Sequence, residues 1–126
     1  MTVRLLAAPL VACALGCHQT VLLGPPTEST CAADSTLTYA NFGQPFMAAY
    51  CTRCHASTLS GSQRHGAPLL HDFDTLYGIQ PFIAHIDETT ASGPAATNTA
   101  MPYDGAMPSL GERQMLGEWL ACGIPP

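Results

Sequence analysis

Apolar residues recur at helical spacing near the C-terminal end of the chain. Ser109 and Glu112 stand three residues apart, the spacing of a capping box, which exchanges hydrogen bonds with the first turn of a helix. The apolar positions that follow share one helical face: Met115, Leu116, Trp119 and Leu120. Gly123 and Pro125 then end the pattern. The sequence therefore predicts an amphipathic helix that begins just after Ser109.

A second helix is predicted before Cys51. Pro45 suits the first turn of a helix, because its missing N–H would have no partner there. Phe46 and Tyr50 are four residues apart and therefore share one face of this helix. The helix is expected to run into the segment that contains Cys51.

A middle helix is predicted over Thr75–Asp87, with Asp74 as its N-cap. Pro81 is expected to kink or split it. Its apolar side consists of Leu76, Ile79, Ile83 and Ile86. Since no segment alternates with the period of a strand, the sequence predicts an all-α fold of three to four helices.

The N-terminal segment has the pattern of an export signal. Arg4 precedes an apolar stretch, residues 5–15, that is too short to span a membrane. The stretch ends in Ala-Leu-Gly before Cys17, which resembles a bacterial lipobox, whose cysteine becomes the lipidated N-terminus. Cys13 stands in a similar sequence, and ordinary signal cleavage is a further alternative. We expect export to the periplasmic or cell-envelope side, with a lipid on Cys17 as the membrane anchor.

Three segments follow from these patterns. Residues 1–16 are the expected lipoprotein signal peptide. Residues 17–36 are rich in Pro, Gly and Thr and have no sustained period, so we expect a flexible tether. Residues 37–126 are the expected folded domain.

Charge narrows the classes of partner. The chain has 126 residues, a net charge of −5, four arginines and no lysine. Without a basic stripe the main driving force for nucleic-acid binding is missing, so no nucleic-acid partner is expected. Removal of the signal takes away Arg4 and no acidic residue, so the exported domain is more acidic still. An acidic surface favours partners that present a basic docking surface.

The motif Cys51-Thr-Arg-Cys54-His55 has the pattern of a haem attachment site. On a helical turn, positions i, i+3 and i+4 lie on one face, so both thiols and the imidazole are presented together. Two thiols can form thioethers with the vinyl groups of one haem, and the imidazole can bind its iron. The sequence predicts one covalent haem c, with Cys51 and Cys54 as attachment residues and His55 as an iron ligand.

Two alternatives share the same cysteines. A zinc site is one, because Cys51 and Cys54 are followed by His65 and His71 at nearly the spacing of a Cys2His2 finger. Pro68 interrupts the helix that such a finger needs, and the histidine of the motif would have no role. A thioredoxin-like redox pair is the other, but the surrounding sequence lacks the required βαβ pattern.

From about Thr38 to Gly123 the chain resembles small class-I-like mono-haem cytochromes c, particularly exported domains that end in a Met-Pro segment and a Trp-containing helix. In that family a glycine lies eight residues before the first haem cysteine, where the first and last helices cross. Gly43 occupies this position. An aromatic residue usually lies four before that cysteine, where this chain has Met47 with Phe46 beside it.

The resemblance also implies a partner for the haem histidine. In the family, a proline carbonyl shortly after that histidine accepts the proton of its Nδ1 atom. Gly66-Ala-Pro68-Leu69 lies at about the right separation from His55. Pro68 is therefore expected to fix the tautomer and orientation of the imidazole, and a simple loop proline is the alternative.

The resemblance implies a methionine as the second axial ligand. In the family a Met-Pro segment precedes the helical tryptophan by about eighteen residues, and Met101 has this separation from Trp119. Met107 repeats the Met-Pro dipeptide and remains the rival. Met47 and Met115 are expected to be packing residues. Bis-His ligation, which would give a lower potential, remains open with the three candidates His65, His71 and His85.

The remaining cysteines suggest a disulfide. Once Cys13 is removed with the signal, Cys17 is assigned to lipid and the two motif cysteines to haem, Cys31 and Cys122 are left. In an oxidising compartment such a pair can bridge the two ends of the domain.

The sequence therefore favours an electron carrier that is not an enzyme: a one-electron haem protein with His55 and Met101 as axial ligands and redox proteins as partners. The alternative is a haem sensor or redox-enzyme subunit with an open or displaceable distal site.

Overall fold

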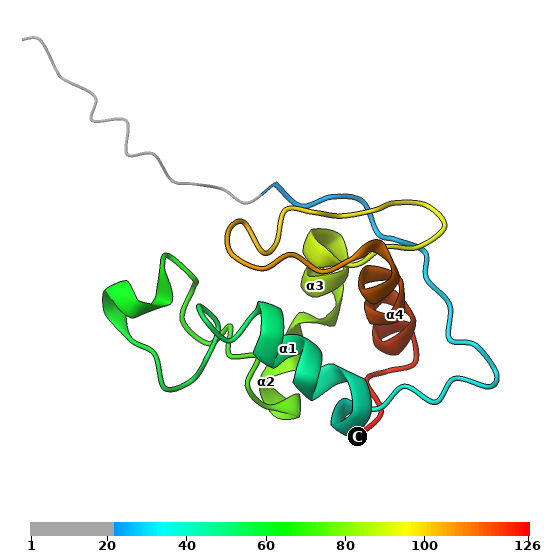
Figure 1. Cartoon of the computed structure of the whole chain (residues 1–126), viewed down its shortest axis with the longest axis horizontal. Coiled ribbons are helices and arrows are strands. Elements are labelled where there is room, and N and C mark those ends of the chain that lie inside the picture. The colour runs from blue at the N-terminus through cyan, green and yellow to red at the C-terminus, as the bar shows by residue number, and fades with distance from the viewer. Residues whose placement is uncertain (1–21) are drawn as a thin grey trace, which may run out of the picture.

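The computed structural model describes residues 22–126. This part of the chain is helical and contains no strand, in agreement with the all-α prediction; one isolated antiparallel bridge joins Ser92 and Thr97. The α-helices are α1 (Gln44–Tyr50), α2 (Leu76–Ile79), α3 (Ile83–Thr90) and α4 (Leu110–Ala121). Three short helical turns accompany them: η1 (Tyr39–Gly43), η2 (Gly61–Arg64) and η3 (Gln80–Phe82). Long loops separate α1 from α2 and α3 from α4 (Figure 1). No helix among residues 22–126 is long and apolar enough to cross a membrane.

The predicted first helix is confirmed. Thr38 and Asn41 form a capping box that begins η1, and η1 continues directly into α1. Pro45 lies in the first turn of α1, as expected. Phe46 is buried, and its ring packs on that of Tyr50 with the centroids 5.0 Å apart.

The crossing of the first and last helices forms the core. Trp119 of α4 is fully buried, and its ring fills the space where a Cβ on Gly43 would lie. Phe42 meets the same indole edge-on, with the ring centroids 6.1 Å apart. Because Gly43 has no side chain, the two helices approach closely at this point. In Figure 1 the C-terminus lies beside the start of η1, where the Tyr39 N–H donates to the Pro125 carbonyl (2.7 Å).

The middle segment is split, as Pro81 led us to expect. Pro81 lies in η3, which separates α2 from α3, and α3 continues to Thr90, three residues beyond the predicted end. The predicted cap was wrong. Thr75 caps α2 by accepting from the Gly78 N–H (3.1 Å), whereas the Asp74 carboxylate accepts from the N–H and hydroxyl of Ser57.

The last helix begins and ends as predicted, except for one packing position. The capping box of Ser109 and Glu112 is present, and Gly123 has a φ of +78° after the helix ends. Leu116 and Leu120 are buried, but Met115 is exposed. The buried face also takes in Arg113 and Gly117, so it is rotated away from Met115, which falls at its edge.

Residues 22–36 do not form the flexible tether that we expected. Thr27 is fully buried, and its N–H and hydroxyl both donate to the Asp87 carboxylate. The Gly24 N–H donates to the Glu88 carbonyl (2.8 Å), and the Thr27 carbonyl accepts from Ala95 (3.0 Å). Short polar side chains and backbone groups thus fix this segment along the end of α3 and the following loop (Figure 1). Residues 17–21, the signal segment 1–16 and the proposed lipid site Cys17 lie outside the described residues.

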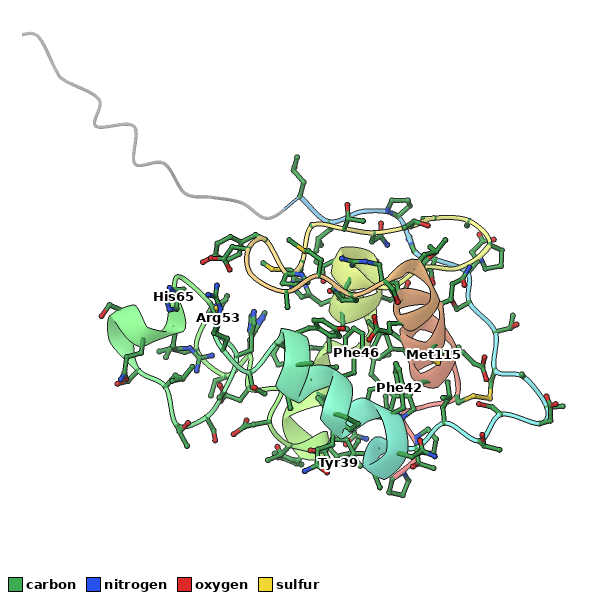
Figure 2. All side chains as sticks on the ribbon, in the orientation of Figure 1. Tyr39, Phe42, Phe46, Arg53, His65 and Met115 are labelled. Carbon is green, nitrogen blue, oxygen red and sulfur yellow. A yellow bond between two sulfur atoms is a disulfide. The ribbon has the colours of Figure 1, made fainter. Side chains whose placement is uncertain are left out.

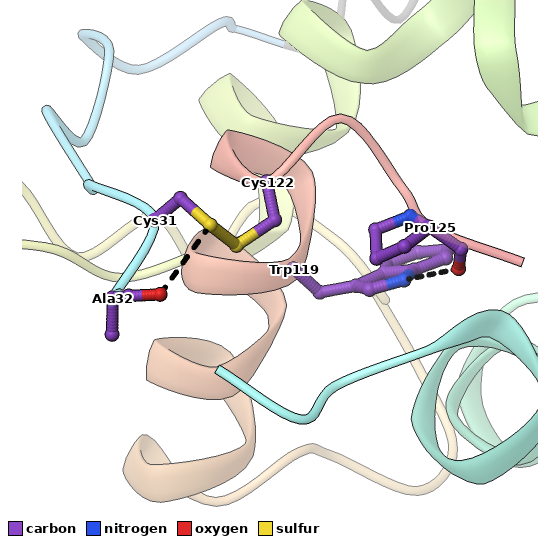
Figure 3. The surroundings of a disulfide bond; sticks show 5 residues. All are labelled: Cys31, Ala32, Trp119, Cys122 and Pro125. Atoms are coloured by element: carbon purple, nitrogen blue, oxygen red, sulfur yellow. Dashed lines mark hydrogen bonds between the residues drawn. A yellow bond between two sulfur atoms is a disulfide. The ribbon is translucent and has the colours of Figure 1, made fainter. Parts of the chain in front are cut away.

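A disulfide joins Cys31 to Cys122, the pair that the cysteine pattern suggested. It lies beside Trp119, whose Nε1–H donates to the Pro125 carbonyl (3.4 Å) (Figure 3). The bond therefore links the N-terminal segment to the end of α4, 91 residues away in sequence.

Replacing both of these cysteines with serine should destabilise the exported protein by about 4–5 kcal/mol, because a closed loop of this length restricts the unfolded chain. Urea unfolding of the double variant and of wild type measures the difference. Unchanged stability, or free thiols at both positions in the wild-type protein, would contradict the disulfide.

Gly43→Ala should cost about 1–3 kcal/mol or more, because the new methyl group overlaps the Trp119 ring. Gly111→Ala is the matched control, since Gly111 lies in α4 with open space around it, and should stay within about 1 kcal/mol of wild type. Denaturant midpoints give both values. Equal effects of the two substitutions would show that the close crossing is not what Gly43 provides.

Candidate functional site

A cavity of about 900 Å³ lies next to the core. Its wall is formed mainly by four parts of the chain: the end of α1 with the segment that follows it, the loop of residues 65–73, α3, and the loop of residues 100–104. Leu22 lines it as well. The volume falls in the range of about 300–1,000 Å³ that is usual for small-molecule and cofactor sites. Most of the residues with predicted chemistry line it: Cys51, Cys54, His55, His65, Pro68, His71, His85 and Met101.

The Cys51–His55 motif forms a helical turn at the end of α1. Cys51 is the C-cap of this helix, and its carbonyl accepts from the N–H groups of Cys54 (3.1 Å) and His55 (2.9 Å). This turn brings both thiols and the imidazole to the same cavity, which is the arrangement that the spacing predicted.

The two motif cysteines are free thiols. Burial, together with the neighbouring Cys54, raises the pKa of Cys51 to about 12. A thiol–disulfide exchange site needs a thiolate and therefore a lowered pKa. This environment disfavours the interpretation of the motif as a redox pair.

His55 is held on two sides. Its Nδ1 lies 3.1 Å from the His71 carbonyl, and the Phe73 ring stacks on it with the centroids 4.7 Å apart. A carbonyl can only accept, so Nδ1 carries the proton and the lone pair is on Nε2. Burial lowers the pKa of His55, which keeps the imidazole neutral at pH 7 and available as a metal ligand.

The expected role of Pro68 was wrong. The Pro68 carbonyl accepts from Nη2 of Arg64 (2.7 Å), and the His71 carbonyl occupies the position beside His55. The family pattern placed a proline at a suitable separation, but in this chain Arg64 binds that carbonyl.

Arg64 organises the loop that follows the motif. It is 3% exposed, although it lies at the end of a surface turn, and its Nη1 pairs with Asp72 (2.8 Å). Its guanidinium also donates to carbonyls throughout the loop: those of Ala56, Leu59, Ala67, Pro68 and His71. Sequence reasoning missed this residue, because no periodic pattern marks an arginine that is buried by a loop.

Arg113 organises the loop between α3 and α4 in a similar way. It is 4% exposed, and its Nη1 donates to the carbonyls of Thr90 (2.7 Å), Asn98 (2.9 Å) and Met101 (3.0 Å). The Met101 N–H in turn donates to the Thr89 carbonyl (2.9 Å). Both backbone groups of Met101 are therefore fixed. The only sequence signal was an arginine on the apolar side of α4.

The two candidate methionines differ in position. Met101 is partly buried and lines the cavity, whereas Met107 is exposed and does not line it. The geometry therefore brings Met101, and not Met107, together with the Cys51–His55 turn.

The three remaining histidines also line the cavity. The His71 ring packs on Phe82 with the centroids 4.0 Å apart and lies 5.3 Å from that of His85. In the part of the chain that the structure describes, no three side chains of His, Cys, Asp or Glu are grouped so that they could hold a metal ion. The zinc alternative therefore finds no support there.

Two contacts join the loop of Met101 to the other wall of the cavity. Arg53, within the motif, forms an ion pair with Asp104, and the Tyr103 hydroxyl donates to the His65 carbonyl (3.1 Å). Figure 2 shows Arg53 and His65 beyond the end of α1, between it and η2. Since Arg53 and Asp104 are exposed, water screens their ion pair and it adds little to stability.

The sequence matches no protein-family model, no characterised protein and no solved structure. Any assignment of a function to this protein therefore rests on the residues of the cavity.

Arg113→Lys should loosen the loop that contains Met101. The ammonium group of lysine cannot reproduce the geometry of a guanidinium that donates hydrogen bonds to three carbonyls. We expect a loss of about 1–3 kcal/mol and faster hydrogen exchange of the Met101 N–H. Arg53→Lys is the control and should leave both the stability and this exchange rate close to wild type, because Arg53 is exposed. Unchanged exchange at Met101 in the Arg113 variant would contradict this role.

Proposed function

We propose that this protein is an electron carrier with one covalently attached c-type haem and axial ligands from His55 and Met101. The observation that carries the proposal is the meeting of three elements in one cavity. These are the paired thiols of Cys51 and Cys54, an imidazole with its Nε2 lone pair free, and a methionine whose backbone is fixed on both sides.

The residues suit a haem chemically. Each thiol can form a thioether by adding its sulfur and its hydrogen across one vinyl group, which needs no oxidant. The His71 carbonyl holds the imidazole of His55 in the tautomer that leaves Nε2 for iron. Apolar side chains such as Phe73 and Ile86 line the cavity and would exclude water from a porphyrin.

When bound, a haem supplies one-electron exchange between ferrous and ferric iron. Two protein ligands leave no position for a substrate, which favours electron transfer over catalysis. The thioether of Met101 favours the ferrous state and so raises the potential. In this proposal the protein is not an enzyme, and its partners are redox proteins.

The charge of the chain favours one kind of partner. With no lysine and a net charge of −5, the protein suits redox proteins that present basic residues near their own electron-transfer site. Association of this kind should weaken as salt increases. From the pattern of the N-terminal residues we also propose that the protein is exported and anchored to a membrane by a lipid on Cys17.

The test is the absorption spectrum of the protein exported by a host that attaches c-type haem. An alkaline-pyridine spectrum of the covalent haem c type and a far-red methionine–iron band in the oxidised form are expected. Met101→Ala should abolish the far-red band, because it removes the thioether ligand. Met107→Ala is the matched control and should retain the band, since Met107 is exposed outside the cavity.

Other outcomes would decide against the proposal. Absence of covalent haem would exclude a c-type cytochrome. Covalent haem without the far-red band would favour bis-His ligation or an open site. Ready carbon monoxide binding by the reduced protein would favour the alternative, a haem sensor or redox-enzyme subunit with a displaceable distal ligand.

A further inference from the structure

We propose that Arg64 is a positioning residue that sets the electron-donating strength of His55 through the His71 carbonyl, and that Asp72 limits this effect. The inference rests on the proposed haem function. It concerns Arg64 and Asp72, for which the sequence predicted no role.

The central contact is a shared acceptor. The oxygen of His71 lies 3.1 Å from Nδ1 of His55 and 3.1 Å from Nη2 of Arg64. A carbonyl oxygen has two lone pairs, so it can accept from both donors at once. The cationic donor and the neutral donor therefore compete for the electron density of one oxygen atom.

The surroundings make this competition strong. The Arg64 side chain is 4% exposed, so water screens its charge little. Asp72 is the charge that opposes it, with Oδ1 2.8 Å from Nη1. The Asp72 side chain is 23% exposed, so it compensates the guanidinium from the solvent side of the contact.

The sign of the effect follows from the chemistry of imidazole. When Arg64 withdraws density from the carbonyl, the bond from the Nδ1–H of His55 weakens and the ring has less imidazolate character. A less anionic ring donates less to iron, which favours the ferrous state. Arg64 should therefore raise the reduction potential, and the carboxylate of Asp72 should lower it.

A purely structural role for Arg64 predicts a different result. Arg64 also binds four other loop carbonyls, so its loss, or the loss of its partner Asp72, could loosen the loop. Loosening would admit water in either case and would shift the potential in the same direction in both variants. Opposite shifts therefore separate the electronic role from the structural one.

The experiment measures the midpoint potential of the haem-loaded protein with Arg64→Gln and with Asp72→Asn. We expect a lower potential for the first and a higher potential for the second. In the reduced proteins, the proton NMR signal of the His55 Nδ1–H should move downfield in Arg64→Gln, because its hydrogen bond strengthens, and upfield in Asp72→Asn.

Asp74→Asn is the matched control. It removes the same charge from the same segment, but Asp74 binds Ser57 and makes no hydrogen bond to Arg64. Its potential should shift much less than that of Asp72→Asn. An equal shift would mean that general charge near the site, and not the shared carbonyl, sets the potential, and would overturn the inference.

Asp72→Asn also keeps the test decisive if Arg64→Gln fails to fold, because it leaves every carbonyl contact of Arg64 available. An unmoved or lowered potential in Asp72→Asn, or an unmoved Nδ1–H signal, would overturn the role of Arg64 while haem binding stands. Wild-type protein without covalent haem would instead overturn the proposed function, and this inference with it.

Discussion

The structure depends on the way its loops satisfy their backbone carbonyls. In the described residues there is no sheet, and long connections run between short helices, so many carbonyls have no partner from regular secondary structure. Buried carbonyls need donors. Two almost fully buried guanidinium groups supply them: Arg64 to the loop after the Cys51–His55 turn, and Arg113 to the loop that contains Met101. Each arginine thereby shapes one wall of the cavity.

This arrangement divides the domain into two parts with different sources of stability. Where η1 and α4 cross, the rings of Tyr39 and Phe42 pack against Trp119, and the disulfide fixes the ends of the chain nearby. Around the cavity, charge-assisted hydrogen bonds from Arg64 and Arg113 add to the packing of apolar side chains such as Phe73. A small domain of this kind has little core of its own, so a large apolar cofactor in the cavity would add contacts that the protein lacks.

Local patterns in the sequence predicted much of the fold. The capping box at Ser109, the break at Pro81 and the turn from Cys51 to His55 each depend on residues within a few positions of one another, and the structure contains all three. The close approach at Gly43 came from the family resemblance and is present as well.

The errors have a common physical cause. The Thr27–Asp87 contact that fixes the supposed tether and the carbonyl that meets His55 both depend on partners brought together by the fold. Arg64 and Arg113 have long side chains that reach several loop carbonyls, and no spacing rule encodes this reach. The prediction for Pro68 failed for the same reason: its position suited the family pattern, but its carbonyl accepts a hydrogen bond from Arg64.

X-ray absorption at the iron edge of the exported protein tests the central claim most directly, because it counts the atoms that surround the metal. We expect five nitrogen neighbours and one sulfur neighbour: four nitrogens from the porphyrin, one from the imidazole of His55, and the thioether sulfur of Met101. A shell of six nitrogen or oxygen neighbours without sulfur would contradict the assignment of Met101, and protein without iron would contradict the assignment of the cavity as a haem site.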